Sequence, residues 1–346
     1  MPVDISIIIP CFNRVALLRQ TLKSVEAAIG GLNAEVILVD DGSDRPISEQ
    51  ITDFAHLPLV ISRQKNAGLT TARYNGLLMA KGEYIQFLDS DDQVAANKFD
   101  VQLKQMRAVD ADVSYTDIAE CFIANETGKL TTKHISQIRR VEEAPLFYIK
   151  VQPAPHSPIF KREYLTSAIA KSFIALSRDY DPIAEVWFYY NLSIHPAKII
   201  KIDEPLTLYI HHNQERITNH WEWQGLSALM LMHQFAQHLP GNHDVYVEKA
   251  KNYVAIAAFN TYRGLPYNID AMLQEAFIDI WRKLGKSKIS DLNGGKYFTF
   301  LSKIIGPVTT SKLFKKLNRN NYQHTRTVSK AELDAKLKPV LKLIKS

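Results

Sequence analysis

The chain has 346 residues, too many for one ordinary core, and its 46% hydrophobic and 23% charged residues are typical of a soluble globular protein of two or three domains. No apolar run approaches the ~20 residues of a membrane span, the first residues show no signal-peptide pattern, and Cys11 and Cys121 lack metal-site spacing, so we expect a cytoplasmic protein with free thiols. The net charge is +6, but residues 286–346 hold 14 Lys and Arg against 3 Asp and Glu, which leaves −5 on residues 1–285.

The first quarter of the chain alternates strand and helix patterns. Residues 4–10 are a nearly continuous β-branched run, which is typical of a buried parallel strand, and residues 14–29 place apolar side chains at helical spacing. The predicted elements run strand, helix, strand, strand, helix, strand over residues 4–10, 14–29, 35–39, 59–61, 70–80 and 84–88. This order predicts a doubly wound, mostly parallel sheet whose ligand crevice lies at the carboxyl ends of the strands.

Two of these strands end in acidic clusters. One is Asp40-Asp41, and the other is the stretch that contains Asp89, Asp91 and Asp92. If the strand continues, Asp89 and Asp91 point the same way, and like charges this close require water or a cation. Solvated turns are the simpler explanation, since Asp, Gly and Ser are turn residues. No glycine-rich dinucleotide or P-loop motif is present.

Four linked motifs follow one another over about the first 115 residues. They are Pro10-Cys11-Phe12-Asn13-Arg14, Val39-Asp40-Asp41-Gly42-Ser43, Asn66-Ala67-Gly68 with Ala72-Arg73, and Gly82-Glu83-Tyr84-Ile85 leading to Asp89-Ser90-Asp91-Asp92. In order and spacing they resemble the motifs of the family 2 glycosyltransferases. The resemblance implies a GT-A fold that transfers a sugar from a nucleotide-sugar donor with inversion at the anomeric carbon. Tyr74 departs from the family pattern, which usually has Asn there.

The resemblance assigns donor binding to Pro10, Phe12, Asp40, Arg73 and Asp89. Asp40 matches the carboxylate that accepts the imide N–H of uracil, which implies a UDP-sugar. Phe12 would pack against the base, and Arg73 would neutralise the diphosphate.

The resemblance also implies a bound Mn²⁺ or Mg²⁺, because Asp89 and Asp91 match the family's Asp-x-Asp motif. We predict Asp91, Asp92 and His212 as metal ligands, since hard oxygen ligands suit these ions. His211 is the alternative to His212, and Arg216 is a weaker candidate for a phosphate contact.

The segment that begins at His156 resembles the family segment before the acceptor region. An acidic pair follows in the family, and its second member is the base for the acceptor hydroxyl. That position is Glu185 here, with Ala184 in the other half of the pair. Asp181 is the rival base and also a plausible helix cap beside Pro182. We favour Glu185.

The last third of the chain carries helical patterns but no motif. The helices are predicted over residues 226–239, 245–262, 269–284 and 297–305. Residues 312–317 and 333–344 mix basic and apolar side chains, as interfacial helices do, so the basic tail either binds a membrane surface or packs on the body.

Together these features predict a GT-A fold with a C-terminal helical region. Residues 1–115 would form the nucleotide-sugar half, residues 116–220 the acceptor half and residues 221–346 the helical region. We expect an inverting glycosyltransferase of the hexosyl- or N-acetylhexosaminyl type that acts on a glycan or lipid-linked acceptor, without nucleic acid. It would work in the cytoplasm or peripherally at the inner face of the cell membrane. An inactive nucleotide-sugar-binding protein and a sugar nucleotidyltransferase are the alternatives.

Overall fold

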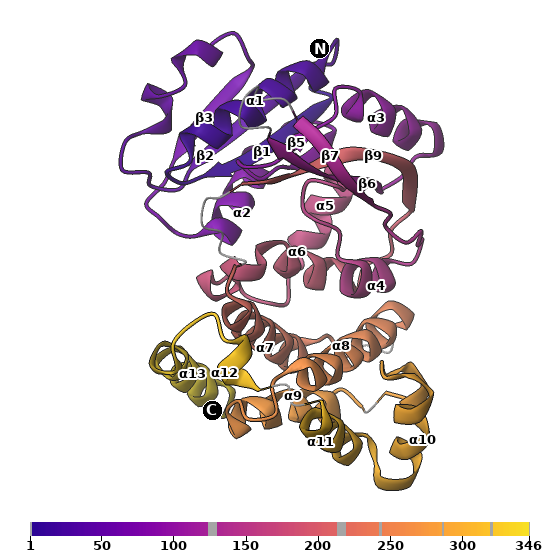
Figure 1. The fold of residues 1–346 in the computed structure, drawn as a ribbon. Coiled ribbons are helices and arrows are strands. Elements are labelled where there is room, and N and C mark those ends of the chain that lie inside the picture. Colours follow the sequence, from indigo (N-terminus) through magenta and orange to yellow (C-terminus); the bar gives the residue numbers. More distant parts are fainter. Residues whose placement is uncertain are drawn as a thin grey trace. The chain divides into compact units, whose positions relative to one another are not determined.

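The computed structural model describes residues 2–123, 130–212, 219–241, 244–285, 287–318 and 321–345. The chain divides into two compact units (Figure 1). The first consists of residues 1–172, 176–178 and 195–214, and the second of residues 173–175, 179–194 and 215–346. The predicted functional boundaries after residues 115 and 220 stay predictions.

The first unit is built on a mixed sheet of nine strands within the described residues, in the order β3-β2-β1-β4-β8-β6-β9-β5, with β7 paired to β6. The four leading strands are parallel, as predicted; they are β1 (Ile5–Cys11), β2 (Ala34–Asp40), β3 (Leu59–Arg63) and β4 (Tyr84–Phe87). Every residue of β1, β2 and β4 is buried, which explains their unbroken apolar pattern.

Helices cover both faces of these strands (Figure 1). On one face, α1 (Val15–Ile29) and α3 (Lys98–Val109) bury Leu18 and Phe99 in one cluster with Ile7 of β1. On the other face, α2 (Leu69–Met79) lies so close to β1 that a Cβ at Gly76 would come within 2.4 Å of the Ile8 side chain. The glycine therefore lets α2 rest directly on the sheet, next to the strand ends.

The remaining strands form the second half of the sheet. They are β5 (Gln93–Val94), β6 (Val113–Ile123), β7 (Leu130–Ser136), β8 (Ile159–Lys161) and β9 (Ile199–His211). Residues 120–145 have the polar composition of a loop, yet they contain the end of β6 and all of β7. The polar character of β7 reflects its edge position, because all its side chains are exposed or half-buried. Short helices α4 (Ala144–Leu146) and α5 (Arg162–Ile169) complete this unit.

The second unit is helical in its described residues, and the predicted C-terminal helical region is confirmed. It begins with α6 (Ala184–Leu192) and continues through α7 (Trp221–His238), α8 (Val245–Gly264), α9 (Ala271–Lys283), α10 (Gly295–Ile305), α11 (Pro307–Leu317), α12 (Tyr322–Thr325) and α13 (Lys330–Lys345). Gly306-Pro307 separates α10 from α11, because Gly306 has φ +82° and Pro307 opens the next helix.

Candidate active site

The acidic stretch after β4 is a turn. Asp92 donates its backbone N–H to the Asp89 carbonyl at 3.2 Å, and β4 ends at Phe87. The strand thus ends before Asp89, so the expectation that Asp89 and Asp91 lie on one face of a continuing strand is wrong. Because the chain turns here, the three carboxylates of the turn contact different partners, which come from different parts of the first unit.

Asp89 is paired with Arg73. The Arg73 side chain is 1% exposed and forms an ion pair with the Asp89 carboxylate, which is 26% exposed. Arg73 lies one turn before Gly76 on α2, so the close packing of α2 on β1 brings the guanidinium to the end of β4. The arginine is thus not a solvated helix residue but a buried cation beside the acidic turn.

Asp91 contacts two basic side chains from distant parts of the sequence. Arg14 Nη1 lies 2.7 Å from Asp91 Oδ2, and His212 Nε2 lies 3.1 Å from the same oxygen. The Asp91 and His212 side chains are 10% and 6% exposed. The structure thus brings together two of the three predicted metal ligands. Arg14 was not predicted, although it ends the first family motif.

His211 lies elsewhere. Its Nε2 is 3.2 Å from Glu120, and its ring stacks on Phe122 with ring centroids 4.3 Å apart. Of the two histidines considered from the sequence, His212 is therefore the one at the acidic turn. Arg216, the other candidate in this region, lies outside the described residues.

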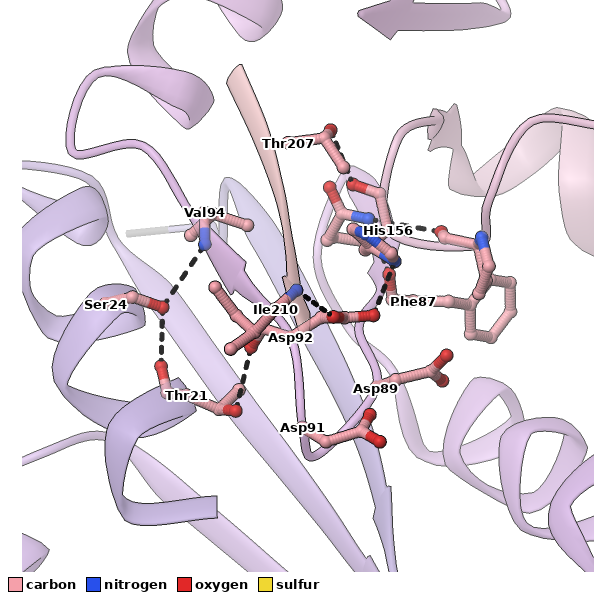
Figure 2. A network of polar contacts seen from close by, with 12 residues as sticks. Thr21, Ser24, Phe87, Asp89, Asp91, Asp92, Val94, His156, Thr207 and Ile210 are labelled. Atoms are coloured by element: carbon pink, nitrogen blue, oxygen red, sulfur yellow. Dashed lines mark hydrogen bonds and ion pairs between the residues drawn. The ribbon is translucent and has the colours of Figure 1, made fainter. Parts of the chain in front are cut away.

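Asp92 connects the turn to β9 and to a buried histidine (Figure 2). Its Oδ1 accepts the backbone N–H of Ile210 at 2.9 Å, and its Oδ2 lies 3.5 Å from His156 Nδ1. Its backbone carbonyl accepts the hydroxyl of Thr21 on α1 at 2.8 Å. One oxygen of this predicted metal ligand therefore holds the end of β9, close to His212.

His156 is a site residue that the sequence did not assign. Its side chain is 1% exposed, and within the described residues neither ring nitrogen has a partner that meets hydrogen-bond geometry. One ligand atom each from Asp89, Asp92 and His156 lie within 4.8 Å of one another. Burial lowers the pKa of His156 to about 4, so the imidazole is neutral at pH 7 and has a lone pair to offer a cation.

The segment that carries His156 is fixed by a buried lysine. Lys98 on α3 donates to the Ser157 carbonyl at 3.1 Å and to Gln102 Oε1 at 2.5 Å. Burial lowers the pKa of Lys98 well below its usual value. A buried lysine is costly unless oxygens accept its hydrogen bonds. These bonds must therefore be kept, and they fix the position of the Ser157 loop and of His156.

The acidic end of β2 organises the neighbouring loops. Asp41 accepts the backbone N–H groups of Ala67 and Gly68 at 2.8 and 2.9 Å, which joins two of the family motifs directly. Asp40 is 1% exposed and accepts the backbone N–H groups of Ser43 and Ile47 at 2.9 and 3.2 Å. Asp40 therefore stabilises its own loop, independently of any hydrogen bond to a nucleotide base.

The first motif places an aromatic ring beside these loops. Pro10 is buried within β1, whereas Phe12, just after the strand, is 46% exposed. A large aromatic ring left this exposed at the carboxyl end of a parallel strand is available to stack on a flat ligand.

The two candidate bases belong to the second unit. Glu185 lies in the first turn of α6 and is half-buried. Asp181 lies in the preceding 3-10 segment (Arg178–Ile183). The position directly before α6 is held by Ile183 and not by Asp181, which lies two residues earlier. Because these residues and the acidic turn lie in different units, the choice of base stays a prediction.

Known proteins resemble this chain in sequence. Residues 6–168 match the model of glycosyl transferase family 2. An uncharacterised glycosyltransferase of Rickettsia bellii is 39% identical over 116 residues, which are 32% of this chain and 16% of that protein. The matches to the first relatives thus span only 16–20% of the relatives' own lengths. An uncharacterised glycosyltransferase of Haemophilus influenzae is 26% identical over 81% of this chain and 90% of its own length.

The fold also matches solved structures. S. aureus TarS 1–349 in complex with UDP-GlcNAc superposes with a TM-score of 0.62 at 15% identity, covering 92% of each chain. The predicted GT-A fold is thereby confirmed. Residues 6–168 thus form a domain that matches glycosyl transferase family 2, and the chain shares its fold with TarS.

Proposed function

We propose that the protein transfers a hexosyl or N-acetylhexosaminyl group from a UDP-sugar, with inversion, to a hydroxyl of a glycan or lipid-linked acceptor. The observation that carries this proposal is the meeting of the Arg73–Asp89 pair with the Arg14–Asp91–His212 contacts at the strand ends. Support for the donor comes from the fold, which TarS shares in its complex with UDP-GlcNAc.

The donor would lie across the carboxyl ends of β1, β2 and β4. Phe12 is exposed enough to stack on uracil, and Pro10 and Asp40 shape the strand ends next to it. Arg14 and Arg73 already face carboxylates of the turn, so their charges are in place to attract a diphosphate.

The chemistry of this cluster fits a divalent cation. Carboxylate oxygens with one imidazole nitrogen suit Mn²⁺, and the oxygens alone suit Mg²⁺. Asp91 and His212, with Asp92 beside them, would hold the ion, and the 3.1 Å between Asp91 Oδ2 and His212 Nε2 is compatible with two ligand atoms of one ion. A bound ion would supply positive charge to stabilise the leaving diphosphate.

The reaction itself would be one displacement. Glu185 would take the proton of the acceptor hydroxyl as its oxygen forms the new bond to the anomeric carbon. The bond from that carbon to the diphosphate oxygen would break on the opposite face, and UDP would leave with the electron pair. Arg73 and Arg14 would stabilise the charge that develops on the diphosphate.

We also propose that the protein works at the inner face of the cell membrane, held there peripherally by its basic C-terminal region. Residues 286–346 carry 14 Lys and Arg against 3 Asp and Glu. No helix in the described part of the chain combines the length and apolar composition needed to cross a bilayer.

Thermal-shift measurements against a panel of nucleotide sugars test the donor. We expect UDP-sugars to raise the melting temperature, more so with Mn²⁺, because a ligand that binds only the folded state stabilises it. UDP release from the stabilising donor then separates an enzyme from a binding protein. Equal shifts from ADP-, GDP- and UDP-sugars would contradict uridine recognition.

Replacing Asp40 by Ala is expected to weaken UDP binding by about 1.5–3 kcal/mol if the carboxylate accepts the imide N–H. The loss of acceptors for Ser43 and Ile47 should also lower the melting temperature of the ligand-free protein, by roughly 2–4 °C per kcal/mol. Calorimetry with UDP and ADP distinguishes the two effects. A purely structural loss weakens the binding of both nucleotides equally, whereas loss of the imide contact weakens the binding of UDP alone. Asp44→Ala, in the same loop but exposed, is the matched control.

A further inference from the structure

The last third of the chain contains two helices with an inverted distribution of side chains. α10 and α11 follow one another and pack side by side (Figure 1). Their buried residues are mostly small or polar, namely Ser302, Thr310, Ser311 and Lys315, with Phe298. Six of their large apolar residues are exposed: Tyr297, Phe300, Ile304, Ile305, Leu313 and Leu317. Helices that only cover a protein core show the opposite arrangement.

The exposed apolar residues form faces rather than scattered points. Tyr297, Phe300 and Ile304 recur at helical spacing on α10 and are 85%, 66% and 64% exposed. Leu313 and Leu317 are one turn apart on α11 and are 42% and 68% exposed. Six of the sixteen large apolar residues exposed in the described chain lie within residues 297–317, so the concentration is local.

The opposite side of the two helices is fixed to their own unit. Lys315 donates to Gln274 at 3.1 Å and lies 3.8 Å from the centre of the Tyr262 ring. Arg263 lies 3.9 Å from the centre of the Phe298 ring. The exposed faces therefore belong to anchored helices, and they stay outward because the inner side is already occupied.

The charged residues on these two helices have one sign. Lys296, Lys303, Lys312 and Lys316 are exposed on the two helices. The sequence has no Asp or Glu between Asp291 and Glu332. Exposed aromatic and aliphatic side chains among lysines, on helices without acidic residues, match an anionic lipid surface, where the apolar groups enter the headgroup boundary and the lysines face the phosphates.

The other basic amphipathic segment does not offer such a face. On α13, Leu333, Leu337, Val340 and Leu341 are all buried, with exposures of 2–9%. Of the two alternatives for residues 333–344, packing on the body is the one that these exposures favour, because the buried apolar side packs within the second unit. The basic tail thus contains one candidate surface in its described residues, on α10 and α11.

We infer that the exposed face of α10 and α11, lined by Tyr297, Phe300, Ile304, Leu313 and Leu317, docks onto membranes that contain anionic lipids. This face gives a location to the peripheral association proposed above and depends on that part of the proposed function alone. It does not depend on the donor chemistry.

Vesicle co-sedimentation of the full chain tests the face. Wild type should bind vesicles of phosphatidylcholine with phosphatidylglycerol, bind phosphatidylcholine alone far more weakly, and dissociate at high salt. The triple variant Tyr297→Ser, Phe300→Ser, Ile304→Ser and the double variant Lys303→Glu, Lys312→Glu should each lose about tenfold or more in partitioning.

Two matched controls locate the effect. Lys338→Glu with Lys342→Glu makes the same charge change on α13, and Val245→Ser with Tyr267→Ser removes exposed apolar groups elsewhere in the second unit. Both should bind vesicles within about twofold of wild type, since neither alters the proposed face. Equal losses in the α13 variant would show that overall tail charge, not this face, drives binding.

Two other results would overturn the inference. One is wild-type partitioning of the triple variant. The other is a vesicle-free dimer that the triple variant abolishes, because the face would then be an interface between copies of the chain. UDP-sugar stabilisation of each variant serves as the folding control, and its failure in wild type would count against the donor proposal only.

Discussion

Replacing Asp91 by Asn is expected to abolish the response of nucleotide binding to Mn²⁺ or Mg²⁺. The amide keeps the shape of the side chain but removes the charge that faces both Arg14 and His212. Mutating a residue that only supports a metal ligand typically lowers metal affinity by ~10–100-fold, so loss of a ligand itself should lower it at least as much. Calorimetry of UDP with and without metal measures it: wild type should gain affinity with metal, and the variant should not.

A second variant decides between the two groups that could hold the ion. Asp89, Asp92 and His156 form the alternative to Asp91 and His212. If the ion lies in that group, His156→Gln loses the metal response and Asp91→Asn keeps it, which is the reverse of our expectation. Asp44→Asn removes an exposed carboxylate after β2 and should respond to metal like wild type.

The nucleotide half of the fold could be predicted because its signals are local. Strands buried on both faces require unbroken apolar runs, and β1 and β2 show them within a residue of the predicted bounds. The edge strand β7 was missed because it lacks this signal. Its side chains are exposed or half-buried, so its composition resembles that of a loop. Whether a strand lies at the edge or in the centre of a sheet depends on the strands beside it, and the local sequence pattern does not reveal these.

The partners within the site were less predictable, because they depend on long-range packing. The contact between Asp91 and His212 was expected only through the family resemblance, since the two residues are 121 positions apart in the sequence. The approach of His156 to Asp92 had no such support, and it depends on Lys98 holding the Ser157 loop from α3. A histidine at the start of a recognised segment was the one available signal.

Exposure in the C-terminal region was also beyond the sequence. Residues 312–317 and 333–344 have similar mixtures of lysine and leucine, and both were candidates for a membrane surface. Only the packing of each helix distinguishes them: Leu317 is 68% exposed, whereas Leu337 is 2% exposed. Amphipathic patterns show that a helix has an apolar side and leave open which partner covers it.

The position of Glu185 follows from how α6 is anchored. Trp187 donates its indole N–H to the carbonyls of Ile174 and Ala175 at 3.1 and 3.2 Å. Asn191 accepts the backbone N–H groups of Phe173 and Ile174, both at 3.1 Å. These contacts fix the helix from one end to the other, so its first turn, with Glu185, has a defined place in the second unit.

Replacing Glu185 by Gln is expected to reduce sugar transfer by about 10²–10⁴-fold, or roughly 3–5 kcal/mol in the barrier, while donor affinity stays unchanged. The reason is that the amide keeps the size and polarity of the side chain but cannot take the proton of the acceptor hydroxyl. The measurement is kcat for transfer to an identified acceptor, with donor Kd from calorimetry.

Two further Asp→Asn variants test whether the effect is specific to Glu185 as the base. Asp181→Asn changes the rival carboxylate in the segment before α6, and Asp179→Asn changes an exposed carboxylate in the same segment. Both should keep most of the transfer activity, because only a group within reach of the hydroxyl proton contributes to general-base catalysis. If instead Asp181→Asn is inactive and Glu185→Gln transfers sugar normally, the base lies one helical turn earlier, at Asp181.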